Sequence, residues 1–335
     1  MKRPWLAPFV PLYAAGVAWR NRRIERCAEA VRNLDWPVVS IGNLSTGGAG
    51  KTPLTIALAK ALTARGLHVD VLSRGYGRRS KLPARVDPDG TADEFGDEPL
   101  LIARETGVPV YVAAQRYQAG LLAEADAPEG KDGAVHLLDD GFQHRQLHRD
   151  VDILLLNGQD WEDSLLPAGN LREPLGAANR ATVLAVPADE PAFEQYLREI
   201  VPFDRCTELP RWIEPIWQLK RTMQVPECDG PVVAFCGIAR PEQFFAGLET
   251  GGLRLAACVA FADHRRYTAA DLSRLVAAAR TTGASALITT EKDHVRLGAL
   301  AQSIPASVPL KTARLRIEIE DESAALDWLV GRLTS

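Results

Sequence analysis

The stretch SIGNLSTGGAGKTPLTIAL, residues 40–58, has residue types and a spacing that suit phosphate binding. Phosphate-binding P-loops follow the pattern G-x-x-x-x-G-K-[ST] between a strand and a helix, and GKT at 50–52 matches its end. Ser45 stands where the first glycine is expected, and two extra glycines after it can supply the same backbone freedom. Lys51 would reach the β- and γ-phosphates and the Thr52 hydroxyl would bind magnesium. The alternative is a glycine-rich turn without a ligand. The predicted nucleotide site consists of Thr46, Gly47, Gly48, Ala49, Gly50, Lys51 and Thr52.

Acidic residues follow apolar strands farther along the chain. Asp139 and Asp140 end the strand in VHLLDDGFQH, and P-loop enzymes use a carboxylate at a strand end to hold magnesium, directly or through water. An acidic pair can also cap a turn. Glu173 lies in the long loop LLPAGNLREP, and such loops often carry active-site residues. The predicted magnesium ligands are Thr52, Asp139, Asp140 and Glu173.

Other polar positions have a structural explanation beside a functional one. Asp97 in FGDEPLL begins a predicted helix and would make a good N-cap. His264 lies in FADHRRY, and a single histidine is more often a packed or surface residue. A basic cluster lies at 74–81, within the stretch SRGYGRRSK (73–81). It could contact an anionic substrate or form a solvated face. In TTEKDHVRL, Lys292 and Asp293 are adjacent, which departs from the N/T-K-x-D pattern of guanine-specific GTPases.

The elements that must position these residues alternate between short β-branched runs and helical ones. In PLTIALAKALTARG, leucines recur every four residues, which indicates a helix. The alternation predicts an α/β fold, a P-loop NTPase-like parallel sheet with helices on both faces. Ligands in such sheets bind at the carboxyl ends of the strands. After a connector at 202–230, rich in Pro and Trp, a second series predicts a smaller C-terminal α/β domain. The predicted divisions are 1–30, 31–205 and 206–335.

Composition excludes several classes of protein. The 335 residues are 46% apolar and 24% charged, which is ordinary for a soluble globular chain. A net charge of −4 does not favour bulk binding to nucleic acid. Five cysteines without C-x-x-C spacing argue against a disulfide framework or a zinc site and fit a reducing compartment.

The N-terminal residues differ from the rest of the chain. Residues 1–32 hold seven Lys/Arg against two Glu, and they surround the apolar run WLAPFVPLYAAGVAW at 5–19. A spanning helix needs ~20 apolar residues, so this run is short. A signal peptide would need a small-residue cleavage site, and none is clear. The pattern favours an amphipathic anchor lying in the membrane interface, with arginines facing anionic headgroups. The alternative is a helix packed on the core or on a partner.

Together these motifs resemble one family, the tetraacyldisaccharide 4′-kinases of lipid A biosynthesis. The matching segments, which run in order from residue 42 to 293, are GNLSTGGAGKTP, SRGYG, GDEP, DDGFQH, LLPAGNLREP, FCGIARPEQFF, DHRRY and TTEKD. The resemblance implies transfer of the ATP γ-phosphoryl group, with Mg²⁺, to the 4′-hydroxyl of a tetraacyldisaccharide 1-phosphate, forming lipid IVA. It implies a peripheral or monotopic enzyme on the cytoplasmic face of the Gram-negative inner membrane. No nucleic acid and no obligate protein partner is expected.

The resemblance also implies roles for single residues. Asp97 would pair with His264 as the base that activates the sugar hydroxyl, and Lys51 would act in the transfer step. Because Asp97 and His264 lie in different predicted domains, the smaller domain at 206–335 would close over ATP. The residues by themselves leave three alternatives: a P-loop ATPase that drives a conformational change in a partner, a soluble small-molecule kinase, and a nucleotide sensor that transfers nothing.

Overall fold

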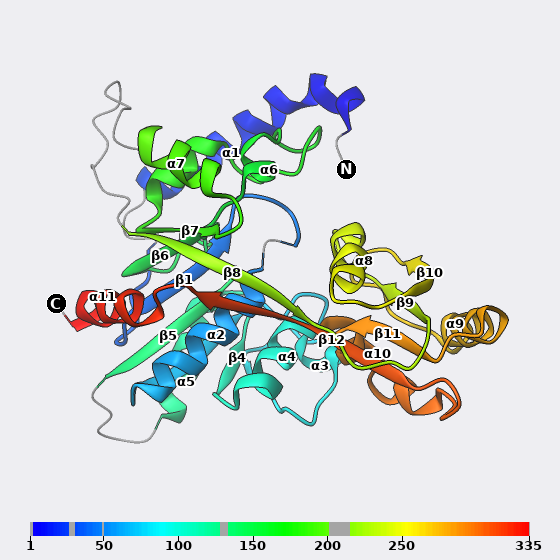
Figure 1. The fold of residues 1–335 in the computed structure, drawn as a ribbon. Helices are drawn as coiled ribbons and strands as arrows, with labels where there is room; N and C mark the ends of the chain where they lie inside the picture. Colours follow the sequence, from blue (N-terminus) through cyan, green and yellow to red (C-terminus); the bar gives the residue numbers. More distant parts are fainter. Residues whose placement is uncertain (1–2, 27–30, 49, 128–132, 201–214, 335) are drawn as a thin grey trace.

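The strands of this protein join into one long sheet (Figure 1). The structure, a computed structural model, describes residues 3–26, 31–48, 50–127, 133–200 and 215–334. Within these residues the sheet has 12 strands, in the order β10-β9-β11-β12-β8-β7-β6-β1-β5-β2-β4-β3. The strands are β1 (Val38–Asn43), β2 (His68–Ser73), β3 (Ala84–Arg85), β4 (Val110–Val112), β5 (Ala134–Asp139), β6 (Val151–Leu155), β7 (Val183–Pro187), β8 (Ile216–Gln224), β9 (Val232–Cys236), β10 (Leu255–Ala260), β11 (Ala286–Thr290) and β12 (Leu310–Ile319).

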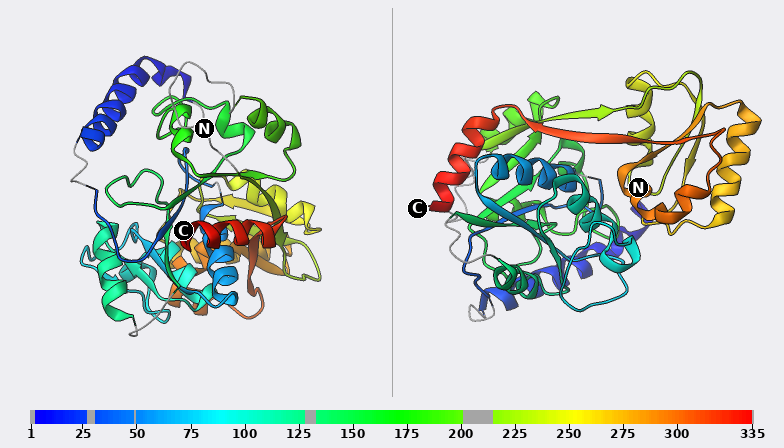
Figure 2. Two further views of the ribbon diagram at one scale, coloured as in Figure 1. Left: turned by 90° about the vertical axis from the view of Figure 1, so that its left-hand side faces the viewer. Right: turned by 90° about the horizontal axis from the view of Figure 1, so that it is seen from below.

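Helices cover the sheet, as the alternation of the sequence predicts (Figure 2). They are the 3-10 helix η1 (Pro4–Phe9), α1 (Val10–Arg26), α2 (Lys51–Ala64), α3 (Ala92–Phe95), α4 (Asp97–Thr106), α5 (Arg116–Asp126), α6 (Gly158–Trp161), η3 (Leu175–Arg180), α7 (Pro191–Ile200), α8 (Pro241–Thr250), α9 (Ala269–Thr282), α10 (Glu291–Leu297), η4 (Gly298–Ser303) and α11 (Glu322–Thr334). Neighbouring strands are parallel except in the pairs β8–β12 and β3–β4. The predicted α/β class with a mostly parallel sheet is therefore confirmed.

The strands β8 and β12 connect the two halves of the sheet. The first part of β8 pairs with β7, and its end runs antiparallel to β12. The start of β12 pairs instead with β11. The prediction that 202–230 is a connector is therefore wrong for 216–224. In that strand Trp217 and Leu219 are buried on one face, but the proline-rich composition around them hides this short alternation. Residues 201–214 of the predicted connector lie outside the described residues.

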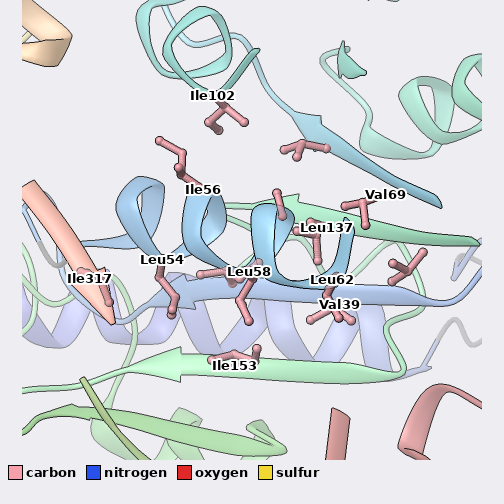
Figure 3. Close-up of a cluster of buried hydrophobic side chains, with 14 of the residues drawn as sticks. Val39, Leu54, Ile56, Leu58, Leu62, Val69, Ile102, Leu137, Ile153 and Ile317 are labelled. Carbon is pink, nitrogen blue, oxygen red and sulfur yellow. The ribbon is translucent and has the colours of Figure 1, made fainter. Parts of the chain in front are cut away.

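The helix α2 holds the end of the P-loop segment against the sheet. Leu54, Leu58 and Leu62 are fully buried, with Val39 of β1 and Ile153 of β6 in the same cluster (Figure 3). Burying a leucine side chain contributes about 1.5–3 kcal/mol, so this face fixes the position of the helix and of Lys51 at its start. Residues of the last helix, α11, belong to the same cluster. The division of the chain at residue 206 stays a prediction.

The N-terminal helices lie along one side of the molecule (Figure 2). Four large apolar side chains are exposed there, Trp5, Phe9, Leu12 and Trp19. Val17 is the buried residue of α1. Among the described residues, no helix is long and apolar enough to cross a bilayer.

A buried histidine with two carboxylates supports the entry of the chain into β1, at the end of the strands opposite to the P-loop. The His136 Nδ1 atom lies 2.7 Å from Asp70 Oδ1, and its Nε2 atom lies 3.3 Å from Glu124 Oε1. The ring of Trp36 stacks on His136, and Glu124 also accepts a hydrogen bond from the Trp36 amide. Burial by itself would lower the pKa of His136, but the two carboxylates outweigh it and raise the pKa to about 9.

This cluster predicts a stability that decreases at alkaline pH. A histidine in the unfolded chain has a pKa of about 6.5. The protonated ring of His136 therefore contributes its full stabilisation of the folded state below that pH. The contribution is lost as the pH rises through about 9, and at most about 3 kcal/mol is involved. The measurement is the free energy of unfolding by denaturant from about pH 6 to 9.5. His136→Gln should lose the decrease of this free energy with pH, whereas a variant at the exposed His148, His148→Gln, should keep it. Equal slopes in the two variants would contradict the assignment.

Candidate active site

The P-loop segment runs from the end of β1 to the start of α2, as its motif predicts. Gly47, Gly48 and Gly50 have φ of +91°, +45° and +90°, a region of backbone conformation that favours glycine. Gly50 is the N-cap of α2 and Lys51 is its first residue. Ala49 of the predicted nucleotide site lies outside the described residues.

Lys51 faces the end of the neighbouring strand β5. Its Nζ atom donates to Asn43 Oδ1 at 2.9 Å and lies 3.5 Å from Asp140 Oδ1. The Arg172 Nη1 atom donates to both oxygens of Asp140, at 3.1 and 3.0 Å. Burial by itself would raise the pKa of Asp140, but Lys51 and Arg172 outweigh it and hold the pKa well below its usual range. Asp140 is therefore an ionised carboxylate between two cations.

Asp139 differs from its neighbour because nothing neutralises it fully. Thr55 donates to its Oδ1 atom at 3.2 Å, but its buried Oδ2 atom has no hydrogen-bond partner among the described residues. Burial, followed by the charges of Glu98 and Asp140, raises the pKa of Asp139 to about 7. A buried acceptor without a donor is costly, and a divalent cation would compensate for it. Thr52 is also buried, at the start of α2. Asp139, Asp140 and Thr52 therefore fit the chemistry of a magnesium site.

The structure places Glu173 differently from the predicted magnesium ligand. Its side chain is fully buried, with Oε1 accepting from Arg20 at 3.0 Å and Oε2 from Arg180 at 2.5 Å. Because both oxygens are taken by guanidinium groups, this geometry gives no support to a metal role. The predicted metal role rested on the place of Glu173 in the long loop after β6, and that sequence does not show that Arg20, more than a hundred residues away, reaches the carboxylate.

Asp97 and His264 come together from different halves of the sheet. The Asp97 Oδ2 atom lies 3.3 Å from His264 Nδ1 and accepts from Arg296 Nε at 2.6 Å. Gly96, not Asp97, is the N-cap of α4, so the structural alternative for Asp97 does not hold. His264 has φ +55°, and its ring lies 4.9 Å from that of Tyr76, centroid to centroid.

The charges of this pair are fixed by its neighbours. Burial by itself would raise the pKa of Asp97, but the hydrogen bond to His264 and the charge of Arg296 hold it well below its usual range. The hydrogen bond to Asp97 raises the pKa of His264 above its usual value of 6.5. Asp97 is thus an ionised partner that orients the more exposed histidine.

The segment TTEKDHVRL supplies functional neighbours that sequence reasoning missed. Lys292 Nζ donates to Glu98 Oε1 at 2.5 Å, and the Lys292 charge also acts on Asp97 and Asp139. Asp293 is fully buried and accepts from Tyr267 Oη at 2.8 Å and from Arg296 at 3.0 Å. The available signal was a polar run directly after the buried strand β11, the same pattern that pointed to Asp139 and Asp140.

Comparisons with known proteins decide the family. The family described as tetraacyldisaccharide-1-P 4′-kinase matches residues 2–334. A tetraacyldisaccharide 4′-kinase of Koribacter versatilis is 42% identical over 96% of this chain and 97% of its own length. One of Xanthobacter autotrophicus is 41% identical over 92% and 89%. The chain belongs to the tetraacyldisaccharide-1-phosphate 4′-kinase family.

A solved structure agrees with this family. The crystal structure of LpxK from Aquifex aeolicus in complex with ATP superimposes with a TM-score of 0.69 and is 32% identical, covering 98% of both chains. The predicted family, α/β fold and enzyme class, a kinase of lipid A biosynthesis, are therefore confirmed.

In this kinase Ser45 has a specific partner that explains the departure from the P-loop pattern. Its hydroxyl accepts from Asn43 Nδ2 at 2.9 Å and donates to Asp160 Oδ2 at 2.7 Å. Arg240, which precedes α8, donates to the other oxygen of Asp160. A hydrogen-bonded chain thus runs from Lys51 through Asn43 and Ser45 to Asp160 and the second half of the sheet.

The same segment before α8 packs directly on the P-loop glycines. A Cβ atom built on Gly47 would lie 2.3 Å from Ala239 Cβ, and one on Gly48 would lie 3.2 Å from Arg240 Cδ. Gly47 is therefore required for close approach as well as for its backbone conformation.

Removing the Ser45 hydroxyl should weaken nucleotide binding and the fold together. In Ser45→Ala, buried polar atoms of Asn43 and Asp160 lose a partner, and each such loss costs about 1–3 kcal/mol. Thermal unfolding and calorimetric titration with an ATP analogue measure the two effects. Ser45→Thr, which keeps a hydroxyl, is the matched control. If Ser45→Ala behaves as the wild type in both measurements, the hydrogen-bonded chain is not a functional part of the site.

Proposed function

We propose that this kinase transfers the γ-phosphoryl group of ATP to the 4′-hydroxyl of a tetraacyldisaccharide 1-phosphate, forming lipid IVA. One observation carries the proposal. The P-loop lysine with its strand-end carboxylates and the Asp97–His264 pair are joined in one electrostatic cluster, since the charge of Lys292 acts on both Asp97 and Asp139. A site that only sensed nucleotide would have no use for a separate acid–base pair beside the phosphate loop.

The proposed nucleotide site is the P-loop. Backbone amides of the segment from Thr46 to Gly50 would bind the phosphate oxygens at the start of α2, where the helix dipole favours an anion. Lys51 would move its positive charge from Asn43 and Asp140 to the γ-phosphoryl group. Phosphoryl transfer depends mainly on such positioning and charge neutralisation.

The proposed magnesium ligands are Thr52, Asp139 and Asp140, with Glu173 left out because Arg20 and Arg180 bind it. Magnesium sites of phosphotransferases keep water and phosphate ligands and need only one or two carboxylates. When bound, the ion would neutralise phosphate charge. The orphaned Asp139 oxygen and the raised pKa of that carboxyl support this assignment.

The Asp97–His264 pair is proposed as the base. His264, whose side chain is 35% exposed against 5% for Asp97, would face the sugar hydroxyl. As the hydroxyl oxygen bonds to the γ-phosphorus, the bond from phosphorus to the ADP oxygen breaks and the hydroxyl proton passes to this pair. Arg296 would keep Asp97 ionised and in place.

Membrane association and closure complete the proposal. The exposed Trp5, Phe9, Leu12 and Trp19, together with the basic residues around them, support an interfacial position of 1–30 on the cytoplasmic face of the Gram-negative inner membrane. The contacts of Ala239 and Arg240 with P-loop glycines support closure of a smaller domain, 206–335, over nucleotide bound to the P-loop domain, 31–205.

Loss of the base should reduce turnover without weakening nucleotide binding. General-base help is worth about 10²–10⁴ in rate, so Asp97→Asn and His264→Ala should lower kcat by that range. The measurement uses γ-labelled ATP, magnesium and a lipid disaccharide 1-phosphate in detergent micelles, and follows label on the lipid. Asp263→Asn, which removes an exposed charge beside His264, is the control. Label released by the wild type only as free phosphate would instead favour an ATPase.

The pH profile should report the His264–Asp97 contact. A protonated His264 cannot accept the hydroxyl proton, so kcat/KM should rise with pH through an inflection above the ordinary histidine value of about 6.5. In Asp97→Asn the main cause of the raised pKa is gone, and the inflection of the residual activity should move to lower pH. An inflection that stays in place would separate His264 from the titrating group.

A further inference from the structure

The N-terminal residues contact the segment 168–173 at three points, and Glu25 near the end of α1 also accepts a hydrogen bond from Arg145. The Arg3 amide donates to the Ala168 carbonyl at 2.6 Å. The Tyr13 hydroxyl donates to the Arg172 carbonyl at 3.0 Å, and Arg20 pairs with the buried Glu173 carboxylate at 3.0 Å.

The same segment braces the P-loop. The Thr46 amide donates to the Asn170 carbonyl at 2.8 Å, and the Arg172 amide donates to the Leu44 carbonyl at 2.7 Å. Ser45 and Leu171 form an antiparallel bridge between these two bonds. The first residues of the P-loop therefore pair with 170–172 as a short two-stranded ladder, so a displacement of one segment displaces the other.

The side chains of this segment point in two directions. Arg172 reaches Asp140, the carboxylate that also faces Lys51. Its neighbour Glu173 is fully buried between Arg20 of α1 and Arg180 of η3. Removing one partner of a buried charge pair is costly, and Arg20 belongs to the helix whose other face is exposed.

We propose that α1 is a positioning element of the active site, in which Tyr13 and Arg20 hold the segment 170–173 so that Arg172 is aimed at Asp140. The role in phosphoryl transfer rests on the function proposed above, whereas the contacts themselves do not. The helix thereby has two faces. Leu12 and Trp19 are 75% and 64% exposed and serve membrane contact. The residue that follows each of them, Tyr13 and Arg20, binds the segment 170–173 that pairs with the P-loop.

The adjacent residues provide matched variants of the full-length protein. Tyr13→Phe and Arg20→Ala remove the contacts with the segment 170–173, whereas Leu12→Ser and Trp19→Ser change only the exposed face of the helix. Arg20→Lys restores the charge. For each variant, kcat and KM for the lipid are measured in detergent micelles, and membrane binding is measured by flotation with vesicles containing anionic phospholipid.

The two faces should separate in these measurements. Tyr13→Phe should float as the wild type does and keep its KM, while kcat falls about tenfold, because small misplacements of catalytic groups are costly. Arg20→Ala should show the same fall in kcat at saturating lipid, and Arg20→Lys, which keeps the basic charge, is its control for flotation. Arg20→Lys should recover part of the loss. Leu12→Ser and Trp19→Ser should float less and raise KM, with kcat unchanged at saturation. Unchanged kcat in both Tyr13→Phe and Arg20→Ala, or a loss explained by reduced flotation, would overturn the inference.

Hydrogen exchange distinguishes this inference from the function it rests on. Arg20→Ala should speed amide exchange at Thr46 and Arg172 relative to the wild type, with or without a lipid substrate. If the wild type labels no lipid but exchange at these amides increases in the variant, the positioning contact stands and the proposed function fails. If the wild type labels the lipid and neither exchange nor kcat changes in the variant, only the positioning role fails.

Discussion

Four carboxylates gather around the P-loop, and their mutual repulsion is the constraint on which the rest of the site depends. Asp139 ends β5 and Asp140 follows it, and Asp97 and Glu98 begin α4. Three of them have a close cationic partner: Arg296 for Asp97, Lys292 for Glu98, and Arg172 with Lys51 for Asp140. Asp139 has none at contact distance among the described residues, and burial, followed by the charges of Glu98 and Asp140, raises its pKa. Asp139 is thus the carboxylate with the largest electrostatic deficit, and it is where the function proposed above places a cation.

The neutralising cations come from remote parts of the chain. Lys292 and Arg296 belong to α10, in the second half of the sheet, and Arg172 lies in the loop that α1 holds. The strands β8 and β12 are long because they must carry the second half to the place where α10 meets α4. Neither half therefore has a balanced site without the other, and the N-terminal helix contributes to that balance through Arg172.

Local motifs in the sequence predicted a good part of this arrangement. The P-loop, the acidic pair after β5, and the alternation of strands and helices each depend on neighbours within about a dozen residues. Ser45, Arg296 and Glu173 could not be interpreted in the same way, because each also has a partner more than a hundred residues away in the sequence, namely Asp160, Asp97 and Arg20. Of the N-terminal alternatives, the packed helix is seen in the contact of Arg20 with Glu173, while the exposed Trp19 leaves the membrane anchor a prediction.

The charge balance also indicates what can enter the site. A nucleoside triphosphate would bring several negative charges next to the four carboxylates. The cations already there are engaged by those carboxylates. Lys51 is the exception, because its contact with Asp140 is long, at 3.5 Å, and its shorter bond is to the neutral Asn43. It can turn to a phosphate at little cost, whereas Arg172 and Arg296 hold their carboxylates at shorter distances, and releasing Arg296 would leave the buried Asp97 with one cationic partner fewer. On the proposed mechanism, the additional positive charge must therefore arrive with the nucleotide, and the unpartnered oxygen of Asp139 is the point in the described structure best suited to receive it.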